Sequence, residues 1–313
     1  MRYKYFQNAD VEVSELSLGT WGIGGEGWGA TDDKQSIEAV HAMLDQGVNL
    51  IDTAPFYGDG YSEKVIGEAI KGRRNQVMIS TKFGLNTLPN GNCVFNGSKD
   101  NVFKEIEVSL KNLQTDYIDF YFMHWPDPQT PLCEAMTALA ELKKQGKIRF
   151  VGVSNFSEEQ IEEAEKYVKI DVQQPQYSML NRGNENLMRW GAERGINAMA
   201  YGAMGAGILS GTIREKPDFG PDDHRLKFYD FFVEPKFSKT MELLKKLDEV
   251  AAAHDRPVAQ VVINWNAQKP FVGTELVGVR SAKKALQNCA AFEWRLSDQE
   301  IAEIDAEILR LHL

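Results

Sequence analysis

Cysteine is scarce in this sequence of 313 residues. Its 3 cysteines, Cys93, Cys133 and Cys289, lie far apart, and no two of them form a Cys-x-x-Cys pair. A disulfide framework needs an even set of cysteines, and a cysteine metal site needs close spacing. We therefore expect neither, and we interpret the three side chains as buried or incidental thiols.

Basic residues are fewer than acidic residues. The chain has 35 Lys and Arg residues against 45 Asp and Glu residues, which gives a formal net charge of -10 at pH 7. Nonspecific nucleic-acid binding needs a basic surface that displaces counterions. The composition therefore argues against a nucleic-acid partner and favours a small-molecule ligand that meets a locally positive site.

Long apolar runs are missing as well. No window approaches the roughly 20 apolar residues that cross a bilayer, and the opening segment "MRYKYFQNAD" has no apolar region of a secretory signal. We expect no membrane partner and a cytoplasmic location. The composition, 43% hydrophobic and 26% charged, is that of an ordinary globular protein.

Short apolar runs and helical patterns alternate along the chain. The segment 33–47 shows the helical spacing, because Ile37, Val40, Met43 and Leu44 recur on one face. Eight apolar runs are candidate strands, at residues 16–21, 49–51, 77–81, 117–123, 148–153, 171–174, 196–200 and 274–278.

The alternation predicts a fold of the α/β class. Each crossover helix returns the chain to the same end of the sheet, so the strands pair in parallel. Eight such strands closed on themselves form a (β/α)8 TIM barrel, whose core takes about 250 residues. We predict one barrel domain over residues 1–313. A doubly wound sheet is less favoured, because no G-x-G-x-x-G fingerprint follows any candidate strand.

The residues beyond the barrel core fall in identifiable places. Residues 1–13 are typical of an N-terminal β-hairpin that covers one end of the barrel. Residues 256–268 and 296–313 have the pattern of two extra helices. Residues 87–100 and 211–236 are long loops punctuated by Gly and Pro, and long loops in compact domains tend to be functional.

Polar side chains follow the candidate strands. In a TIM barrel the chemistry is assembled at the carboxyl ends of the strands. The polar residues found there are Asp52, Tyr57, Lys82, His124, Ser154, Asn155, Gln176, Tyr201 and Arg280. Each can hydrogen-bond or titrate, which predicts a site at this end of the barrel.

Four of these side chains suggest proton transfer to a carbonyl oxygen. Tyrosine has a reference pKa of about 10, so Tyr57 needs a neighbour that favours the phenolate. A lysine ammonium about 4 Å away at an effective dielectric of about 20 contributes about 4 kcal/mol, or about 3 pKa units. We therefore expect Lys82 to lower the pKa of Tyr57. We expect Asp52 to hold Lys82 charged, and His124 to donate a hydrogen bond to the substrate oxygen.

Glycines gather in the segment "GIGGEGWGA", at Gly24, Gly25, Gly27 and Gly29. The spacing suggests a phosphate-binding loop, but no G-K-[ST] follows it. We interpret the segment as a loop over the active face.

An ordered set of motifs runs from about Leu18 to Asn288. The motifs are "LGTWGIGG", "IDTAPFYGDGYSE", "STKFG", "MHWPDP", "GKIRFVGVSNFS", "QPQYSMLNR", "GILSG" and "GVRS". In this set the sequence resembles the aldo-keto reductases, and the bacterial sugar- and ketone-reducing subgroup and the potassium-channel beta subunits look most similar.

The resemblance implies an NADPH- or NADH-dependent carbonyl reductase on a (β/α)8 barrel, without a metal. It implies that Tyr57 is the general acid, with Lys82 as the group that lowers its pKa. Asp52 would be the partner of the lysine, and His124 would orient the substrate. The substrate would be an aldehyde or ketone, for example a sugar, polyol or cyclitol derivative. From their positions at strand ends we expect Trp21, Phe56 and Trp125 to line the pocket, together with Tyr229 from the aromatic run of the long loop.

The resemblance also implies where the cofactor lies. Ser154, Asn155 and Gln176 would bond the nicotinamide amide, and Tyr201 would stack on its ring. Arg280 and Ser281 would meet the 2'-phosphate, which favours NADP over NAD because a planar guanidinium suits a phosphate. Gln287 and Asn288 would lie near the adenine. The remaining cofactor residues implied are Gly19, Thr20, Trp21, Asp52, Gly202, Met204, Gly207, Leu209, Gly278 and Lys284.

Three departures from the family pattern bear on the cofactor. Relatives commonly read Tyr-Ser-Pro-Leu where this chain has "YGAMGAG" at 201–207. Gln287 stands where relatives often have an acidic residue, and Lys284 replaces a common glutamine.

Two other functions remain as alternatives. One is a regulatory subunit that binds the nicotinamide cofactor with slow turnover, like the channel beta proteins; several turnovers at a substantial rate would argue against it. The other is a metal-dependent hydrolase that uses Asp52 and His124 as ligands. The sequence lacks the H-x-H or clustered carboxylates that such sites need. The oligomeric state stays open.

Overall fold

Eight parallel strands form a closed barrel in the computed structural model. The structure describes every residue except 26, 30, 89–91, 221, 222 and 224. The strands follow one another around the barrel in chain order, and the last strand pairs with the first. They are β3 (Leu16–Gly19), β4 (Leu50–Asp52), β5 (Met78–Phe83), β8 (Ile118–Met123), β9 (Ile148–Ser154), β10 (Val172–Gln174), β11 (Asn197–Tyr201) and β12 (Thr274–Gly278). The predicted (β/α)8 barrel is confirmed.

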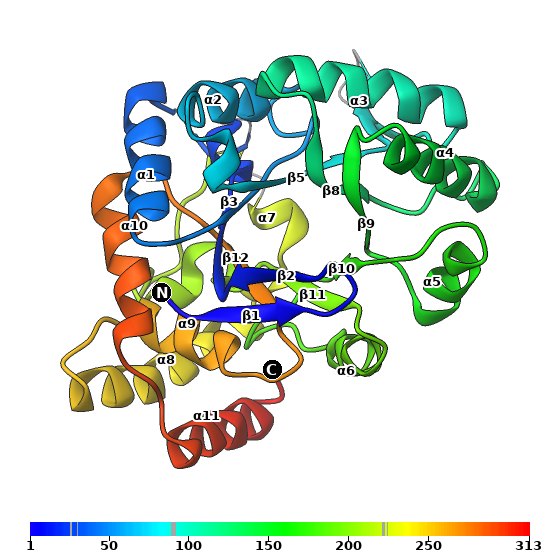
Figure 1. Cartoon of the computed structure of the whole chain (residues 1–313). Helices are drawn as coiled ribbons and strands as arrows, with labels where there is room; N and C mark the ends of the chain where they lie inside the picture. The colour runs from blue at the N-terminus through cyan, green and yellow to red at the C-terminus, as the bar shows by residue number, and fades with distance from the viewer. Residues whose placement is uncertain (26, 30, 89–91, 221–222, 224) are drawn as a thin grey trace.

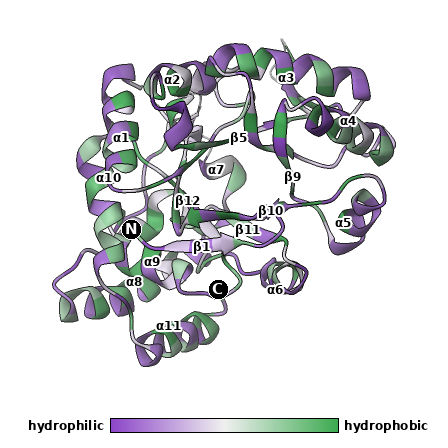
Figure 2. Ribbon diagram, viewed as in Figure 1, coloured by the Kyte–Doolittle hydropathy of each residue, from purple (hydrophilic) through white to green (hydrophobic). Residues whose placement is uncertain are grey.

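Helices surround the barrel as an outer ring (Figure 1). The ring consists of α1 (Asp33–Asp45), α2 (Tyr61–Ala69), α3 (Lys99–Leu113), α4 (Leu132–Lys144), α5 (Glu158–Glu165), α6 (Glu185–Glu193), α8 (Lys236–Ala253) and α10 (Ala282–Cys289). Hydrophilic and hydrophobic residues share these helices in Figure 2, as amphipathic packing on a barrel requires. The two extra helices are also confirmed, as α9 (Val258–Ala267) and α11 (Asp298–Leu311).

The N-terminal hairpin covers the amino end of the barrel, as predicted. Strands β1 (Tyr3–Phe6) and β2 (Val11–Ser14) pair in antiparallel fashion and lie across the front of the barrel in Figure 1. Phe6 is fully buried and joins Phe120 and Met199 in the apolar cluster of the barrel interior. The hairpin therefore closes this end with a side chain from outside the barrel.

The structure departs from the predicted elements in the loops. Part of the predicted loop 87–100 forms a small hairpin of β6 (Leu85–Thr87) and β7 (Cys93–Phe95), and residues 89–91 of that loop lie outside the described residues. The loop 211–236, of which residues 221, 222 and 224 are likewise outside the description, contains the short helix α7 (Arg225–Phe228) and a 3-10 turn at Asp230–Phe232. Short-range hydrogen bonds of this kind leave no long periodic pattern in a sequence.

The first barrel strand is shorter than predicted. It ends at Gly19, and a 3-10 turn follows at Trp21–Ile23. The main-chain N–H and the hydroxyl of Thr20 both donate to the carbonyl of Asp52, at 3.0 and 2.9 Å. Beyond Thr20 the N–H groups of Ile23 and Gly24 donate to the carbonyls of Thr20 and Trp21, at 3.0 and 3.1 Å, and these bonds form the turn that ends the strand.

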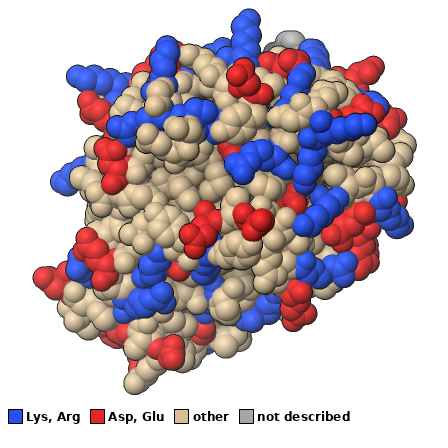
Figure 3. Space-filling model, in the orientation of Figure 1, with Lys and Arg blue, Asp and Glu red and all other residues tan. Residues whose placement is uncertain are grey.

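Charged residues of both signs are interspersed on the face of the molecule that Figure 3 shows. Among the residues that the structure describes, no helix is both long and apolar enough to cross a membrane.

One glycine is required by the packing inside the barrel. Gly152 on β9 pairs with Phe122 on β8. A Cβ atom at position 152 would lie 2.3 Å from Cε1 of the Phe122 ring. The phenyl ring therefore occupies the space that any other residue at position 152 would need.

We expect Gly152→Ala to lower the free energy of unfolding by about 1–3 kcal/mol, the usual cost of overpacking a core. Urea unfolding measures the change. Gly220→Ala is the matched control, because a Cβ there meets no atom within 4 Å. Adding Phe122→Leu should recover part of the loss; an unchanged stability of Gly152→Ala would contradict the packing argument.

Candidate active site

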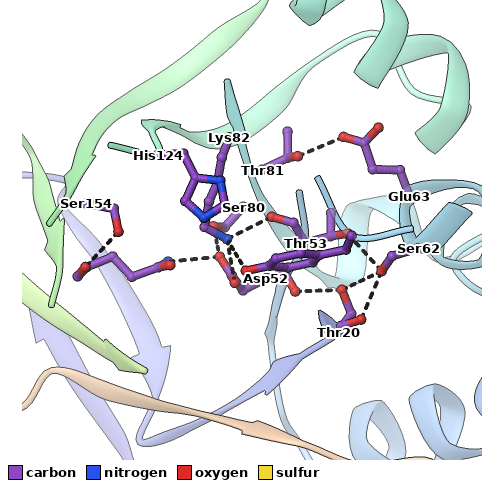
Figure 4. Close-up of polar contacts among 12 residues, drawn as sticks. Thr20, Asp52, Thr53, Ser62, Glu63, Ser80, Thr81, Lys82, His124 and Ser154 are labelled. Atoms are coloured by element: carbon purple, nitrogen blue, oxygen red, sulfur yellow. Dashed lines mark hydrogen bonds and ion pairs between the residues drawn. The ribbon is translucent and has the colours of Figure 1, made fainter. Parts of the chain in front are cut away.

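A buried ion pair lies at the carboxyl ends of β4 and β5 (Figure 4). Lys82 is fully buried and Asp52 is 2% exposed. Nζ of Lys82 donates to Oδ2 of Asp52 at 2.8 Å and to the carbonyl of Thr53 at 2.9 Å. The two charges therefore compensate each other in a region that excludes water.

The second oxygen of the Asp52 carboxylate is also bonded. Oδ1 accepts from Oγ of Ser80 at 2.6 Å and from Nε2 of Gln174 at 2.9 Å. Ser80 precedes Lys82 by two residues on β5, and Gln174 ends β10 on another side of the barrel. Neither residue was predicted from the sequence, although the strand period of two places Ser80 on the same inward face as Lys82.

Tyr57 lies in the loop after β4, beside the ion pair. Nζ of Lys82 donates to Oη of Tyr57 at 3.1 Å. The chain turns sharply at Gly58, whose φ is +65° and whose Cβ would lie 2.3 Å from the carbonyl oxygen of Gly24. Only glycine fits both the positive φ and this contact, so Gly58 fixes the place where the tyrosine leaves the loop.

A row of hydroxyl groups fixes the base of the same loop (Figure 4). Thr53 donates to Oγ of Ser62 at 3.0 Å, and Ser62 donates to Oγ1 of Thr20 at 2.7 Å. The row joins β3, the end of β4 and the first turn of α2. The loop that carries Tyr57 is thus anchored at both of its ends.

The pKa of Tyr57 corrects one expectation. Burial raises the pKa of Tyr57 well above its ordinary value of 10, and the negative charge of Asp52 adds to the rise. We expected Lys82 to lower it, but Asp52 compensates the lysine charge, and burial lowers the pKa of Lys82 itself. Tyr57 is therefore a neutral phenol near pH 7, with a proton to donate.

His124 follows β8 and completes the group of four. Its ring centroid lies 6.1 Å from that of Tyr57 and 6.1 Å from that of Phe56, and it is close to perpendicular to both rings. Burial, and then the charge of Lys82, hold the pKa of His124 well below 6.5. The imidazole is therefore neutral near pH 7.

Aromatic side chains form a wall against Tyr57. Trp21 stacks on the Tyr57 ring at 5.9 Å with an interplanar angle of 22°. Trp28 and Phe228 meet Trp21 edge-on, at 5.1 and 5.8 Å. Trp28 was missed by the sequence analysis, although it lies in the glycine-rich segment that we interpreted as a loop over the active face.

The two other predicted pocket residues line separate clefts. Trp125 is 39% exposed and lies with Asn155 and Asn184 in one cleft. Tyr229 is largely buried and lies with Gln176 in the other. Burial, and then an electrostatic interaction with Tyr57, raise the pKa of Tyr229 to about 12, so Tyr229 also belongs to the surroundings of Tyr57.

The chain is similar to known proteins of one family. The family model described as "Aldo/keto reductase family" matches residues 15–308. The chain belongs to the aldo/keto reductase family. One relative is aldo-keto reductase YhdN of Bacillus subtilis (strain 168), 36% identical over 310 residues, which cover 97% of this chain and 93% of the relative. Another is the NADH-specific methylglyoxal reductase of Escherichia coli (strain K12), 32% identical with 93% of each chain covered.

A solved structure has the same architecture as this aldo/keto reductase. The glycerol dehydrogenase AKR11B4 from Gluconobacter oxydans superposes with a TM-score of 0.88, at 33% identity, over 96% of this chain and 93% of that one. Members of the family use a nicotinamide cofactor to reduce small carbonyl compounds, and this chain is an oxidoreductase of that kind.

The residues expected at the nicotinamide are brought together. Oη of Tyr201 donates to Oδ1 of Asn155 at 2.8 Å, and Nδ2 of Asn155 donates to the carbonyl of His124 at 3.0 Å. Gln176 is bridged to Tyr201 through the main chain. The hydroxyl of Ser154 donates to the carbonyl of Gln174 at 2.8 Å, so its proton holds two strands together.

Further residues expected to bind the cofactor lie at the ends of β3, β11 and β12. Gly19 pairs with Gly278, and Gly202, Met204 and Leu209 lie in or beside a 3-10 turn at Gly205–Ser210. Gly207 in that turn has a φ of +97°, and a Cβ there would meet no atom within 4 Å. The main chain is therefore open to a ligand at this point.

The residues expected at the adenosine end lie around the start of α10. Oγ of Ser281 accepts from the main-chain N–H of Lys284 at 3.4 Å, and the amine of Lys284 donates to the side chain of Gln287 at 3.1 Å. Asn288 is buried, and Arg280 is exposed. Amides near the barrel centre and cations at its rim form a donor set that fits a nicotinamide dinucleotide.

Within the described residues, no three His, Cys, Asp or Glu side chains gather as a metal site.

We expect Asp52→Asn to lower the free energy of unfolding by about 3–5 kcal/mol, because it leaves Lys82 buried without its counter-charge. Urea unfolding measures the loss. The double variant Asp52→Asn with Lys82→Met should recover most of it. Asp45→Asn is the control, since its pair with Arg73 is exposed and costs at most about 1 kcal/mol. Equal losses in the two single variants would contradict the argument.

Proposed function

We propose that this protein interconverts a small aldehyde or ketone and the corresponding alcohol with a nicotinamide cofactor, and that Tyr57 supplies the proton. One observation carries the proposal. A neutral tyrosine lies 3.1 Å from Nζ of a fully buried lysine that is itself paired with an aspartate at 2.8 Å. That arrangement both holds a proton at Oη and prepares a positive charge beside it.

The proton transfer follows from the charges of the site. A reduced nicotinamide, when bound, supplies the hydride that the carbonyl carbon receives. Tyr57 donates its Oη proton to the carbonyl oxygen, and the negative charge left on the phenolate lies beside the Lys82 ammonium. Asp52 keeps Lys82 charged and fixed in place. The site needs no proton from solvent during this step.

His124 positions the carbonyl oxygen. A neutral imidazole carries one N–H donor, which can bond to the substrate oxygen while Tyr57 approaches from its own side. The low pKa of His124 suits this role, because a charged imidazolium beside Lys82 would add a second positive charge to a buried site. His124 therefore donates a hydrogen bond rather than the reacting proton.

The substrate that the site favours is small. Trp21 stacks directly on the ring of Tyr57, so the wall stands close to the reacting oxygen. The relatives named as a methylglyoxal reductase and a glycerol dehydrogenase both act on three-carbon compounds. Methylglyoxal and glyceraldehyde are the first substrates to test, followed by ketosugars and inososes.

For the cofactor, Arg280 and Ser281 favour NADPH. A planar guanidinium can bond a 2'-phosphate through two N–H groups, and the hydroxyl of Ser281 adds a further donor. The NADH-specific relative makes NADH the second cofactor to test.

Replacing Tyr57 by Phe tests the proposal. We expect turnover of any carbonyl that the wild type reduces to fall by at least about 10³-fold, because the proton donor is lost. Binding of NADPH or NADH, followed by tryptophan fluorescence, should change less than about twofold. Turnover is measured by cofactor oxidation. Wild-type turnover in the variant would remove Tyr57 from the proposed role.

The pH dependence is a second test. Because the pKa of Tyr57 lies well above 10, the phenol stays protonated, and kcat for reduction should stay flat from about pH 6 to about pH 9. Oxidation of the alcohol needs the phenolate, so its kcat should rise by about tenfold per pH unit over the same range. A reductive kcat that falls with a midpoint near pH 7 would show that Lys82 does lower the pKa of Tyr57.

A further inference from the structure

A single arginine joins the adenosine end of the site to its aromatic wall. Nη1 of Arg280, in the loop between β12 and α10, donates to the carbonyl of Trp28 at 2.8 Å. We propose that Arg280 is a positioning residue for the substrate wall, in addition to any contact with a cofactor phosphate, and that its bond to Trp28 holds the wall against Tyr57. This rests on the proposed function.

The contacts run without a break from Arg280 to the reacting tyrosine. Trp28, whose carbonyl accepts the arginine bond, meets Trp21 edge-on at 5.1 Å. Trp21 in turn stacks on Tyr57 at 5.9 Å. A shift of the Trp28 main chain is therefore transmitted by direct packing to the ring that covers the proton donor.

Besides the bond from Arg280, the main chain of Trp28 donates its N–H to the carbonyl of Gly25 at 3.1 Å, a bond that stays within the same segment. Its indole Nε1 is buried and has no hydrogen-bond partner among the described residues. The neighbouring Gly25, Gly27 and Gly29 all have positive φ. Such a glycine-rich segment loses much conformational entropy when it is ordered. The charge-assisted hydrogen bond from Arg280 therefore helps to keep this segment ordered. We call this bond the tether.

Arg280 can hold the loop and bind an anion at the same time. The described residues give Arg280 no ion pair, so its charge is uncompensated by any of them. A guanidinium has five N–H donors, and the bond to Trp28 uses one of them. Its stem passes over the turn that follows Trp21, since a Cβ on Gly22 would lie 3.9 Å from Cδ of Arg280.

This arrangement predicts an effect that a phosphate ligand alone would not produce. NADH has no 2'-phosphate. Replacing an arginine that only binds that phosphate would therefore leave the NADH reaction unchanged. An arginine that positions the wall affects the carbonyl substrate with either cofactor. The KM of the carbonyl at saturating NADH is therefore the quantity that separates the two roles.

The test compares Arg280→Ala with the control Lys283→Ala, which removes an exposed positive charge from the same helix start. We expect Arg280→Ala to raise the KM of the carbonyl at saturating NADH by about three- to tenfold, because the wall loses one charge-assisted hydrogen bond. Lys283→Ala should leave it within about twofold. An unchanged KM with NADH, together with weaker binding of NADPH, would overturn the proposal and leave Arg280 as a phosphate ligand only.

A second variant tests whether a shorter donor can replace the arginine. Arg280→Lys keeps a long side chain with N–H donors, whereas glutamine is two atoms too short to place its amide where Nη1 of Arg280 lies. We expect Arg280→Lys to keep the KM of the carbonyl with NADH within about threefold of the wild type. A KM equal to that of Arg280→Ala would count against the tether.

A fluorescence measurement distinguishes failure of the proposed function from failure of the proposed tether. If the wild type reduces no carbonyl with either nucleotide, the proposed function fails, but the tether can still be examined by acrylamide quenching of tryptophan. We expect Arg280→Ala to increase quenching over Lys283→Ala, and the increase to vanish in a Trp28→Phe background. Equal quenching in Arg280→Ala and Lys283→Ala would overturn the tether by itself.

Discussion

The buried pair of Lys82 and Asp52 is the interaction on which the rest of the site depends. Removing two charges from water costs several kcal/mol per ion, and the cost is recovered only when geometry and hydrogen bonds are nearly complete. Here they are complete, because the two carboxylate oxygens and the ammonium bond to Thr53, Ser80 and Gln174 as well as to each other. Those partners lie directly after β4 and in β5 and β10, so the pair requires that the barrel be closed.

The same pair sets the chemistry of its neighbours. Because Asp52 compensates the charge of Lys82, burial decides the pKa of Tyr57 and raises it, so the phenol keeps its proton. His124 also stays neutral, because burial, and then the positive charge of Lys82, hold its pKa low. A balanced pair thus holds a neutral donor and a neutral hydrogen-bonding group around one position. In the proposed reaction the positive charge acts when Tyr57 gives up its proton, because only then is a negative charge beside it.

Much of this architecture is readable in the sequence, since local patterns carry it. The strand runs, the amphipathic helices, the N-terminal hairpin and the two extra helices each follow from periodicity and turn residues within a short window. The short β6–β7 hairpin and α7 were not predicted, because their hydrogen bonds leave no long periodic pattern in the sequence. Tyr57, Lys82, Asp52 and His124 were readable for another reason. The barrel places all strand ends at one face, so a polar residue after each strand is brought to a common site.

What the sequence determined by itself is therefore the barrel and the identity of the four central side chains. Only the tertiary structure decided how charge is balanced among them, because burial and distance are properties of the packed molecule. Three features depend on segments that lie far apart in the chain. They are the raised pKa of Tyr57, the hydrogen bond from Gln174 to Asp52 and the hydrogen bond from Arg280 to Trp28. Such contacts depend on which strands become neighbours when the barrel closes, and no local pattern encodes them.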